Sequence, residues 1–368
     1  MSSCAHSLST QLYAQTHYTS VCAYVTLHAR VKRDDEQIKN DLYDSDYYSI
    51  IPENPNPKAI EKVKAWVKKW DKKGIVPEEI TAFANNVDDS HPGKCKPLVK
   101  THKQPPYPIR LLLSGCGTPV EPLSKIVQMS IRHLTEHLPH QVIDTKEFLQ
   151  KVKKINDNHQ LPETATIAVC DVVALYPNVN NKMGIPATKK LLKEHPSPVD
   201  LPEKCIMEGL DIALDNNYTQ HMDLQGNMIY AKPIRGTAMG PSHSCDYVDI
   251  FMGELDQKIV KDSPVPLLSS LDPNNLPQEL DWSRFRDDGI TILPNEKDVD
   301  KFTEHLQSLH PPHIKWTMKH GKQAEYLDVQ LEIKDGKITT DVFSKHNQAI
   351  CPQQVATRHQ YSKVLYHQ

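Results

Sequence analysis

The sequence lacks several features that would assign it to a class at once. Its 368 residues include eight cysteines but no C-x-x-C pair, and the nearest approach to zinc-ligand spacing is the weak His243-Ser244-Cys245. No apolar run approaches the roughly 18 residues of a membrane span. No basic segment followed by an apolar core marks a secretory signal. We therefore expect free thiols in an intracellular protein of the nucleus or cytoplasm, with no membrane partner.

A strong net charge is also missing. The formal charge is −3, so no global basic field indicates a nucleic-acid partner. The charge is nevertheless uneven, because residues 58–110 carry 12 Lys and Arg against 6 Asp and Glu. A local excess of this kind can bind phosphates while the whole chain stays near neutral. The length allows two or three packed subdomains, and we find no internal repeat.

The segment Phe285–Gly289 (FRDDG) is the most informative feature that is present. Its two aspartates lie between short apolar runs, a pattern that predicts strand, tight turn and strand with carboxylates at the tip. Adjacent carboxylates repel each other, but hard divalent cations prefer oxygen ligands. On its own the pair is more typical of an ordinary surface Asp-Gly turn than of a metal site.

A third carboxylate strengthens the metal interpretation. Residues 165–170 (ATIAVC) form a continuous apolar run that predicts a buried strand, and Asp171 follows it directly. A charged residue at the end of a buried strand needs a partner, and a metal ion is one. If this strand neighbours the Asp287-Asp288 hairpin, three carboxylates converge and can hold two Mg²⁺ ions for in-line phosphoryl transfer.

Other elements follow from periodicity and turn residues. Residues 94–117 predict a β-hairpin that carries cations at its Pro-rich tip, and residues 41–51 predict a short helix or strand. We expect helices over 58–73, 183–194, 202–215, 242–260 and 296–308, two helices within 121–156, a hairpin over 218–231, strands over 313–319, 325–333 and 338–343, and a surface loop over 261–282.

Three motifs together resemble a known family. Asp171–Tyr176 (DVVALY), Arg235–Gly240 (RGTAMG) and Phe285–Asp288 (FRDD) occur in the order and spacing of motifs A, B and C of reverse transcriptases. The likeness is greatest to reverse transcriptases of Penelope-like retroelements and spans roughly 40–350. Local support comes from Ser114–Pro119, Asn216–Tyr218 and Tyr326–Val329. The single phrases are weak, but their joint order is specific.

The resemblance implies roles for particular residues. Asp171, Asp287 and Asp288 would be the catalytic metal ligands for two Mg²⁺ ions, with Mn²⁺ as a substitute. Tyr176 would be the steric gate that favours dNTPs, and otherwise is a core tyrosine. The remaining implied roles are the loop near the nascent base pair (Gly236, Met239, Gly240), triphosphate-binding cations (Lys100, Lys103, Arg110), a candidate general acid (Lys322) and a primer-grip hairpin (Tyr326–Leu331). A solvated basic loop is the alternative for the cations, and a plain surface lysine for Lys322.

The sequence also departs from the family. Phe285 replaces the more usual Tyr, and Leu111-Leu112 replaces Pro-Ile. The Lys-Gly motif expected in the fingers and the GIY-YIG endonuclease domain are not evident. We expect an α+β right-hand polymerase with an N-terminal extension, partly disordered (1–56), fingers (57–165), a palm whose antiparallel sheet has helices on one face (166–333) and the start of a truncated thumb (334–368).

The expected reaction is template-directed addition of dNTPs to a DNA primer on an RNA template. The alternatives are an inactive nucleic-acid-binding remnant and a polymerase that uses ribonucleotides.

Overall fold

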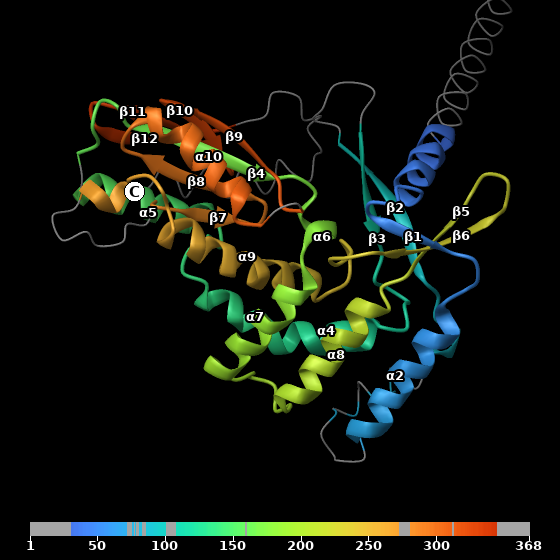
Figure 1. Cartoon of the computed structure of the whole chain (residues 1–368). Helices are drawn as coiled ribbons and strands as arrows, with labels where there is room; N and C mark the ends of the chain where they lie inside the picture. Colours follow the sequence, from blue (N-terminus) through green and yellow to red (C-terminus); the bar gives the residue numbers. More distant parts are fainter. Residues whose placement is uncertain are drawn as a thin grey trace, which may run out of the picture.

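The computed structural model describes residues 31–343 without 72–75, 77, 79–80, 83–85, 101–107, 159, 272–279 and 311–312. These residues form a layer of helices and three sheets, whose strand pairs are antiparallel except for β2 with β5. The described strands form a five-stranded sheet (β1-β6-β5-β2-β3), a four-stranded sheet (β7-β8-β4-β9) and a three-stranded sheet (β10-β11-β12). Figure 1 shows the four- and five-stranded sheets on opposite sides of the molecule, joined by helices. The mixed composition confirms the α+β prediction.

The four-stranded sheet is built around the apolar run identified in the sequence. β4 (Thr166–Val172) lies between β8 (Asp288–Leu293) and β9 (Trp316–Gly321), and β7 (Ser283–Phe285) pairs with the outer edge of β8. Every pairing in this sheet is antiparallel. The adjacency of β4 and the β7–β8 hairpin, on which the convergence of the carboxylates depends, is therefore present.

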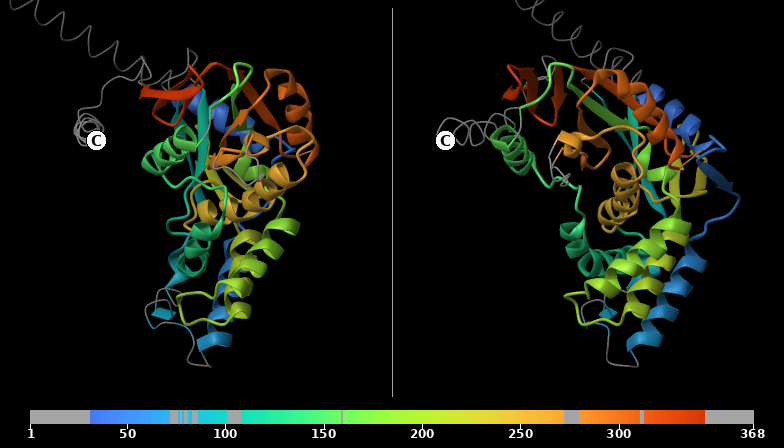
Figure 2. Two further views of the ribbon diagram at one scale, coloured as in Figure 1. Left: turned by 90° about the vertical axis from the view of Figure 1, so that its left-hand side faces the viewer. Right: turned by 60° about the vertical axis from the view of Figure 1, so that its left-hand side comes forward.

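Helices cover one face of this sheet and extend well beyond it. They are α2 (Asn56–Asp71), α4 (Glu121–Ile131), α7 (Asn181–Glu194), α8 (Glu203–Asp215), α9 (Ser244–Lys261) and α10 (Val299–Ser308). Their apolar residues form one large core with Cys170, Val172 and Trp316 of the sheet. Both views of Figure 2 show α2, α7 and α8 at the end of the molecule away from the four-stranded sheet.

The opposite face of the four-stranded sheet is covered as well. Ile167, Ile290 and Ile292 pack with α5 (Thr145–Asn158) and with the three-stranded sheet. That sheet consists of β10 (Gln323–Tyr326), β11 (Val329–Lys334) and β12 (Lys337–Val342). The prediction of helices on one face only was thus incomplete. The strand predicted over 325–333 is a hairpin, because Leu327 adopts a φ of +55° and turns the chain.

The five-stranded sheet brings together segments that are far apart in the sequence. It contains β1 (Tyr48–Ile51), β2 (Gly93–Val99), β3 (Ile109–Leu113), β5 (Thr219–Met222) and β6 (Met228–Pro233). A helix over 31–42 packs its Ile38 and Leu42 against one face. Residues 41–51 therefore contain both a helix end and a strand, and this part of the predicted, partly disordered extension over 1–56 packs with the five-stranded sheet.

The sheet pairings also cross the predicted domain limits. β1 pairs with β6, and β2 pairs with β5, so residues 219–233 of the predicted palm lie with the predicted fingers. β12, which falls in the predicted thumb, pairs with β11 of the predicted palm. The rest of the predicted thumb, 344–368, lies outside the described residues, and the fingers and thumb assignments remain predictions.

The segment 261–282 is not a surface loop throughout. Leu268, in the 3₁₀ turn Leu268–Leu271, is fully buried, as are Leu280 and Trp282. Short helical turns also occur at Val87–Asp89, Arg132–His137, Leu175–Asn178 (α6) and Glu296–Asp298. The Pro/Ser/Asn-rich composition suggested a loop, whereas a few large apolar residues anchor both of its ends.

Candidate active site

The register of β4 and β8 brings the predicted aspartates together. Asp171 lies directly opposite Asp288, and the backbone N–H of Val172 donates to the carbonyl oxygen of Asp287 at 3.0 Å. Residues opposite each other in an antiparallel pair have Cβ atoms about 4.5–5.5 Å apart and project from the same face. Asp171 is exposed although its neighbours Cys170 and Val172 are buried. The two strands thus present carboxylates at one end of the sheet.

The turn of the β7–β8 hairpin is formed by Arg286 and Asp287. Arg286 has a φ of +57°, a region that favours glycine. Gly289 lies within β8 instead, where a Cβ would come within 2.3 Å of the Trp282 ring. The Asp-Gly pair is therefore not an ordinary Asp-Gly turn. Gly289 is required because a buried tryptophan packs directly on the backbone next to Asp288.

The glycine loop 235–240 lies against the segment that follows β4. The N–H of Thr237 donates to Tyr176 O at 3.1 Å, and a Cβ on Gly236, whose φ is +69°, would lie 2.2 Å from the same oxygen. On its other side, Leu113 of β3 donates to Met239 O at 3.0 Å. A Cβ on Gly240 would lie 2.0 Å from Leu113 O. The structure thus brings the predicted loop next to Tyr176.

Tyr176 is half-buried beside the first turn of α9. Its hydroxyl lies 3.2 Å from Cys245 Sγ. Burial raises the pKa of Tyr176 above its ordinary value, and the Cys245 contact acts in the same direction. Cys245 also accepts a hydrogen bond at its backbone oxygen from Arg286 Nη1 at 3.3 Å. One turn of α9 therefore contacts both the predicted gate and the aspartate hairpin.

The predicted cationic hairpin is present as β2 and β3. Arg110 is exposed on β3, opposite Leu98, and is three residues from Leu113, which holds the glycine loop. Lys100 is partly buried at the end of β2, and its N–H donates to Pro108 O at 2.9 Å. Lys103 lies outside the described residues. The base of this hairpin is thus joined to the glycine loop, and Arg110 lies three residues along β3 from that contact.

Lys322 does not lie with the aspartates. It follows β9, and its ammonium donates to the backbone oxygens of Glu163 and, at 2.6 Å, of Ala165. Ala165 precedes β4, whereas Asp171 is near the other end of that strand, about 20 Å away at about 3.3 Å per residue. This placement contradicts the suggestion that Lys322 is the general acid. The neighbouring Tyr326 is closer to the site, since its hydroxyl donates to Asp288 O at 3.2 Å.

The donor chemistry of the three aspartates suits a hard divalent cation, because all three supply carboxylate oxygens. Within the described residues, however, no group of three or more His, Cys, Asp or Glu side chains is arranged to hold a metal ion. The strand pairing therefore brings the carboxylates to neighbouring positions, and their role as metal ligands stays a prediction.

Four charged residues beneath the hairpin were not singled out from the sequence. Arg284 is completely buried between Asp249 and Asp256 of α9, and Arg286 also pairs with Asp249. The available signal was an arginine at a core position of β7 together with two aspartates seven residues apart on the apolar side of a helix.

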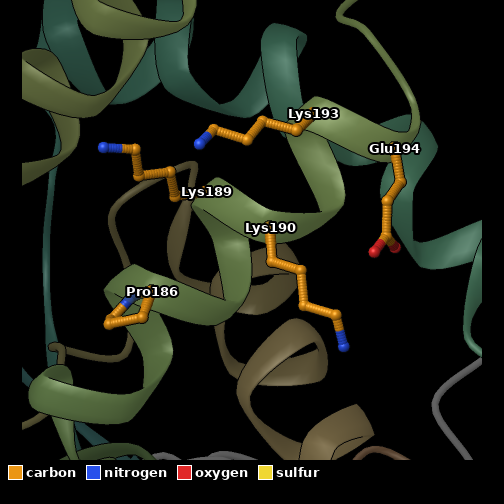
Figure 3. Close-up of a pocket in the computed structure, with 5 residues that line it drawn as sticks. All are labelled: Pro186, Lys189, Lys190, Lys193 and Glu194. Atoms are coloured by element: carbon orange, nitrogen blue, oxygen red, sulfur yellow. The ribbon is translucent and has the colours of Figure 1, made fainter.

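A pocket of about 320 Å³ lies elsewhere, on α7, lined by Pro186, Lys189, Lys190, Lys193 and Glu194 (Figure 3).

Comparison with solved structures shows what this arrangement resembles. The chain aligns with apo telomerase from Candida tropicalis at a TM-score of 0.52 and 13% identity, over 80% of this chain and 56% of that chain. Telomerase from Candida tropicalis in complex with a TWJ fragment of telomeric RNA gives a TM-score of 0.52 and 13% identity over 70% and 45%. The RNA-dependent RNA polymerase of a human picobirnavirus has a TM-score of 0.46 at 12% identity over 95% and 74%.

The fold is that of a right-hand polymerase. The prediction of this fold is confirmed, with an antiparallel palm sheet packed on helices and the three aspartates at one end of it. The chain spans little more than half of the telomerase chain with which it aligns. No protein-family model and no curated protein matches the sequence. None of the described helices has the length and apolar character needed to cross a membrane.

Proposed function

We propose that the chain is the polymerase core of a Penelope-like retroelement reverse transcriptase, an RNA-directed DNA polymerase. Its substrates are dNTPs, and its partners are an RNA template and a DNA primer. The observation that carries the proposal is the direct pairing of Asp171 with Asp288 in a palm sheet, next to Tyr176 and the glycine loop. The order of the three sequence motifs supports the assignment to this family.

The proposed roles follow from the chemistry of each side chain. Asp171, Asp287 and Asp288 hold two Mg²⁺ ions, which when bound lower the pKa of the primer 3′-hydroxyl and stabilise the departing pyrophosphate. The ring of Tyr176 crowds a ribose 2′-hydroxyl and so favours dNTPs. The guanidinium of Arg110 suits bidentate contact with the triphosphate, assisted by Lys100 and Lys103.

The backbone of the glycine loop contributes a surface rather than side chains. Gly236 and Gly240 permit the close contacts with Tyr176 and Leu113. In the proposed role, Met239 contributes to the surface next to the nascent base pair. A bulkier residue at either glycine displaces the loop and hence the gate.

Primer extension with the purified full chain tests the proposal. We expect Mg²⁺-dependent extension of a DNA primer on an RNA template, with Mn²⁺ able to substitute, and loss of at least about a thousandfold in rate for Asp287→Asn. The matched control is Asp341→Asn, which removes an exposed carboxylate on β12 and should extend like the wild type. Absence of extension by the wild type, or equal extension by Asp287→Asn, contradicts the proposal.

Selection between nucleotides separates the proposal from a ribonucleotide polymerase. We expect the wild type to prefer dNTPs and Tyr176→Ala to admit rNTPs, because the alanine leaves space for the 2′-hydroxyl. A wild type that already incorporates rNTPs as readily as dNTPs favours the ribonucleotide alternative.

A catalytically inactive nucleic-acid-binding protein is the second candidate. It is favoured by the absence, among the described residues, of three carboxylates already grouped for a metal ion. Strongly salt-dependent binding of primer–template without extension is the result expected for this candidate.

A further inference from the structure

The strongest unexplained feature of the site is a buried ion-paired group between α9 and the β7–β8 hairpin. The side chains of Arg284, Asp249 and Asp256 are 0%, 0% and 1% exposed. Arg284 Nε donates to both oxygens of Asp256 at 3.0 and 2.9 Å, and Arg284 Nη1 donates to Asp249 Oδ1 at 3.1 Å. The indole N–H of Trp282 donates to Asp256 Oδ1 at 2.7 Å. This group is fixed on several sides.

Stability alone does not account for such a group. Removing charges from water carries a large penalty, and well-packed apolar residues of similar volume often stabilise a protein more than a buried ion pair does. The surrounding core is apolar and could accommodate such residues, since Tyr247, Ile250 and Phe251 of the same helix are fully buried. Unlike an apolar group, the charged group fixes the orientation of the hairpin on α9, because each hydrogen bond restricts the angle and distance between them.

The same charged group also holds the backbone of Arg286, the residue that precedes Asp287. Arg284 Nη1 donates to the backbone oxygen of Arg286 at 2.8 Å. The side chain of Arg286 pairs through Nη1 with Asp249 Oδ2, the second oxygen of the same carboxylate, and reaches Cys245 O. Gln141 donates to that oxygen of Asp249 at 3.1 Å. Asp249 therefore binds both arginines that flank Phe285, one through each carboxylate oxygen.

The contacts of Asp249 with Arg284 and Arg286 form a clamp on the turn, and the backbone of Arg286 shows why a clamp is useful there. Its φ of +57° is unfavourable for a residue with a side chain, by about 1–2 kcal/mol. Glycine would adopt this conformation without that penalty. An arginine at this position gains the contacts with Asp249 and Cys245 in return. The residue next to it in the chain is Asp287, so the position of the turn and the position of the carboxylates are set together.

We infer that Asp249 and Arg286 are positioning residues that lock the Asp287-Asp288 turn onto α9. The inference rests on the proposed function, in which these aspartates bind the metal ions. The same turn of α9 touches the hydroxyl of Tyr176 through Cys245. The same helix therefore positions both the gate that selects the sugar and the carboxylates that hold the metal. A shift of α9 moves both.

Arg286→Ala is the primary test, because its side chain is 36% exposed and its removal leaves Asp249 paired with Arg284 and Gln141. In the full chain we expect a kcat about 10- to 100-fold lower and a higher Mg²⁺ concentration for half-maximal rate, because a displaced catalytic group loses rate steeply. The KM for dNTPs should change by less than about threefold, since the triphosphate contacts are elsewhere. Lys261→Ala, which removes an exposed charge from the same helix, is the matched control.

Hydrogen exchange tests the clamp without requiring activity. The N–H of Val172 donates to Asp287 O and so reports the position of the turn. We expect this amide to exchange about tenfold faster in Arg286→Ala, the factor expected when one charge-assisted hydrogen bond is lost. Arg286→Lys should recover part of the protection, because an ammonium can pair with Asp249 but does not match the fork of donors.

The outcomes separate the clamp from the proposed function. If the wild type does not extend primers but Arg286→Ala accelerates the exchange of Val172, the proposed function fails and the clamp stands. If the exchange of Val172 and the Mg²⁺ dependence in Arg286→Ala both match those of the wild type, the inference is wrong. A loss of activity with unchanged exchange also overturns it, since Arg286 would then act directly on the substrate rather than through the turn.

Discussion

The charged side chains of the four-stranded and five-stranded sheets lie in different environments. The four-stranded sheet is covered on both faces, and its internal charges are paired with α9 or placed at the strand ends with Asp171 and Asp288. The five-stranded sheet packs one face on a small core of Ile38, Leu42, Ile109, Ile229 and Ala231. Its other face exposes Lys94, Lys96 and Arg110. Fixed charges suit metal ligands, whereas exposed cations suit a substrate that arrives and leaves.

Removing a charge should therefore affect stability strongly in one sheet and barely in the other. Arg284→Ala removes the arginine that pairs with the buried Asp256 and leaves Arg286 as the cationic partner of Asp249, so we expect the free energy of unfolding to fall by about 3–5 kcal/mol. Arg110→Ala should change it by less than about 0.5 kcal/mol, because the side chain is exposed. Urea unfolding followed by circular dichroism measures both. Equal effects of the two substitutions would falsify the contrast.

Apolar truncation sharpens the same comparison. Ile292 of β8 is fully buried, and Ile292→Ala should lower the free energy of unfolding by about 2–5 kcal/mol through the lost contacts and the cavity. Leu98 of β2 is 49% exposed, and Leu98→Ala should have an effect below about 1 kcal/mol. Thermal and urea midpoints of the two variants check this order. A larger loss for Leu98→Ala would show that the open face is covered in solution.

Acid should weaken the packing of α9 on α4 through His243, which precedes α9 and contacts Ser124 of α4. Complete burial lowers the pKa of His243 to about 4, and its Nδ1 lies 2.9 Å from Ser124 Oγ. Because the unfolded chain takes up the proton near pH 6.5, the stabilisation is present above that pH and is lost as the pH falls towards 4. We expect a loss of about 2 kcal/mol between pH 7 and pH 5.

The comparison of wild type with His243→Asn isolates this titration from that of other groups. The variant retains a polar partner for Ser124 but has no titrating ring, so its urea midpoint should depend less on pH over this range. A pH dependence identical to that of the wild type would assign the acid sensitivity to other residues.

The exposed cations should matter for nucleotide binding and little for the fold. If Arg110 binds the triphosphate as proposed, Arg110→Ala should raise the KM for dNTPs about tenfold or more, and Arg110→Lys should raise it less. Steady-state primer extension at varied dNTP concentration measures this. Lys94→Ala, on the same face, is the control for a general loss of positive charge. A normal KM for Arg110→Ala would indicate that the open face does not contact the triphosphate.

Local patterns were sufficient to predict the elements that carry the site. The apolar run before Asp171, the short β7–β8 hairpin and the glycines of the 235–240 loop each constrain a few neighbouring residues. Their convergence was predicted only through the resemblance of three motifs in order. The suggested role of Lys322 as a general acid does not fit its position, because its ammonium binds backbone oxygens just before β4. The sequence near Tyr326 does not say at which end of an antiparallel sheet a turn lies.

The clamp was missed for a related physical reason. The two charged residues of the Asp249–Arg284 pair are 35 residues apart, and no local pattern links an aspartate in a helix to an arginine in a later strand. Composition was equally misleading over 261–282, where Pro, Ser and Asn suggested a surface loop while Leu268, Leu280 and Trp282 enter the core. Pairings of this kind depend on the whole fold and are not encoded in any single segment.

The strand order of the five-stranded sheet also determines when the protein can fold as it is synthesised. Among the described strands, β1 pairs with β6 alone, and β2 reaches β5 and β6 through its pairing with β5, so both wait for residues 219–233 to leave the ribosome. Pairing over about 180 residues is slow because a long loop must close first. Until then the edges of β1 and β2 are open to other chains. Fragments that end before residue 233 should consequently aggregate, and co-expression of residues 203–343 should rescue them.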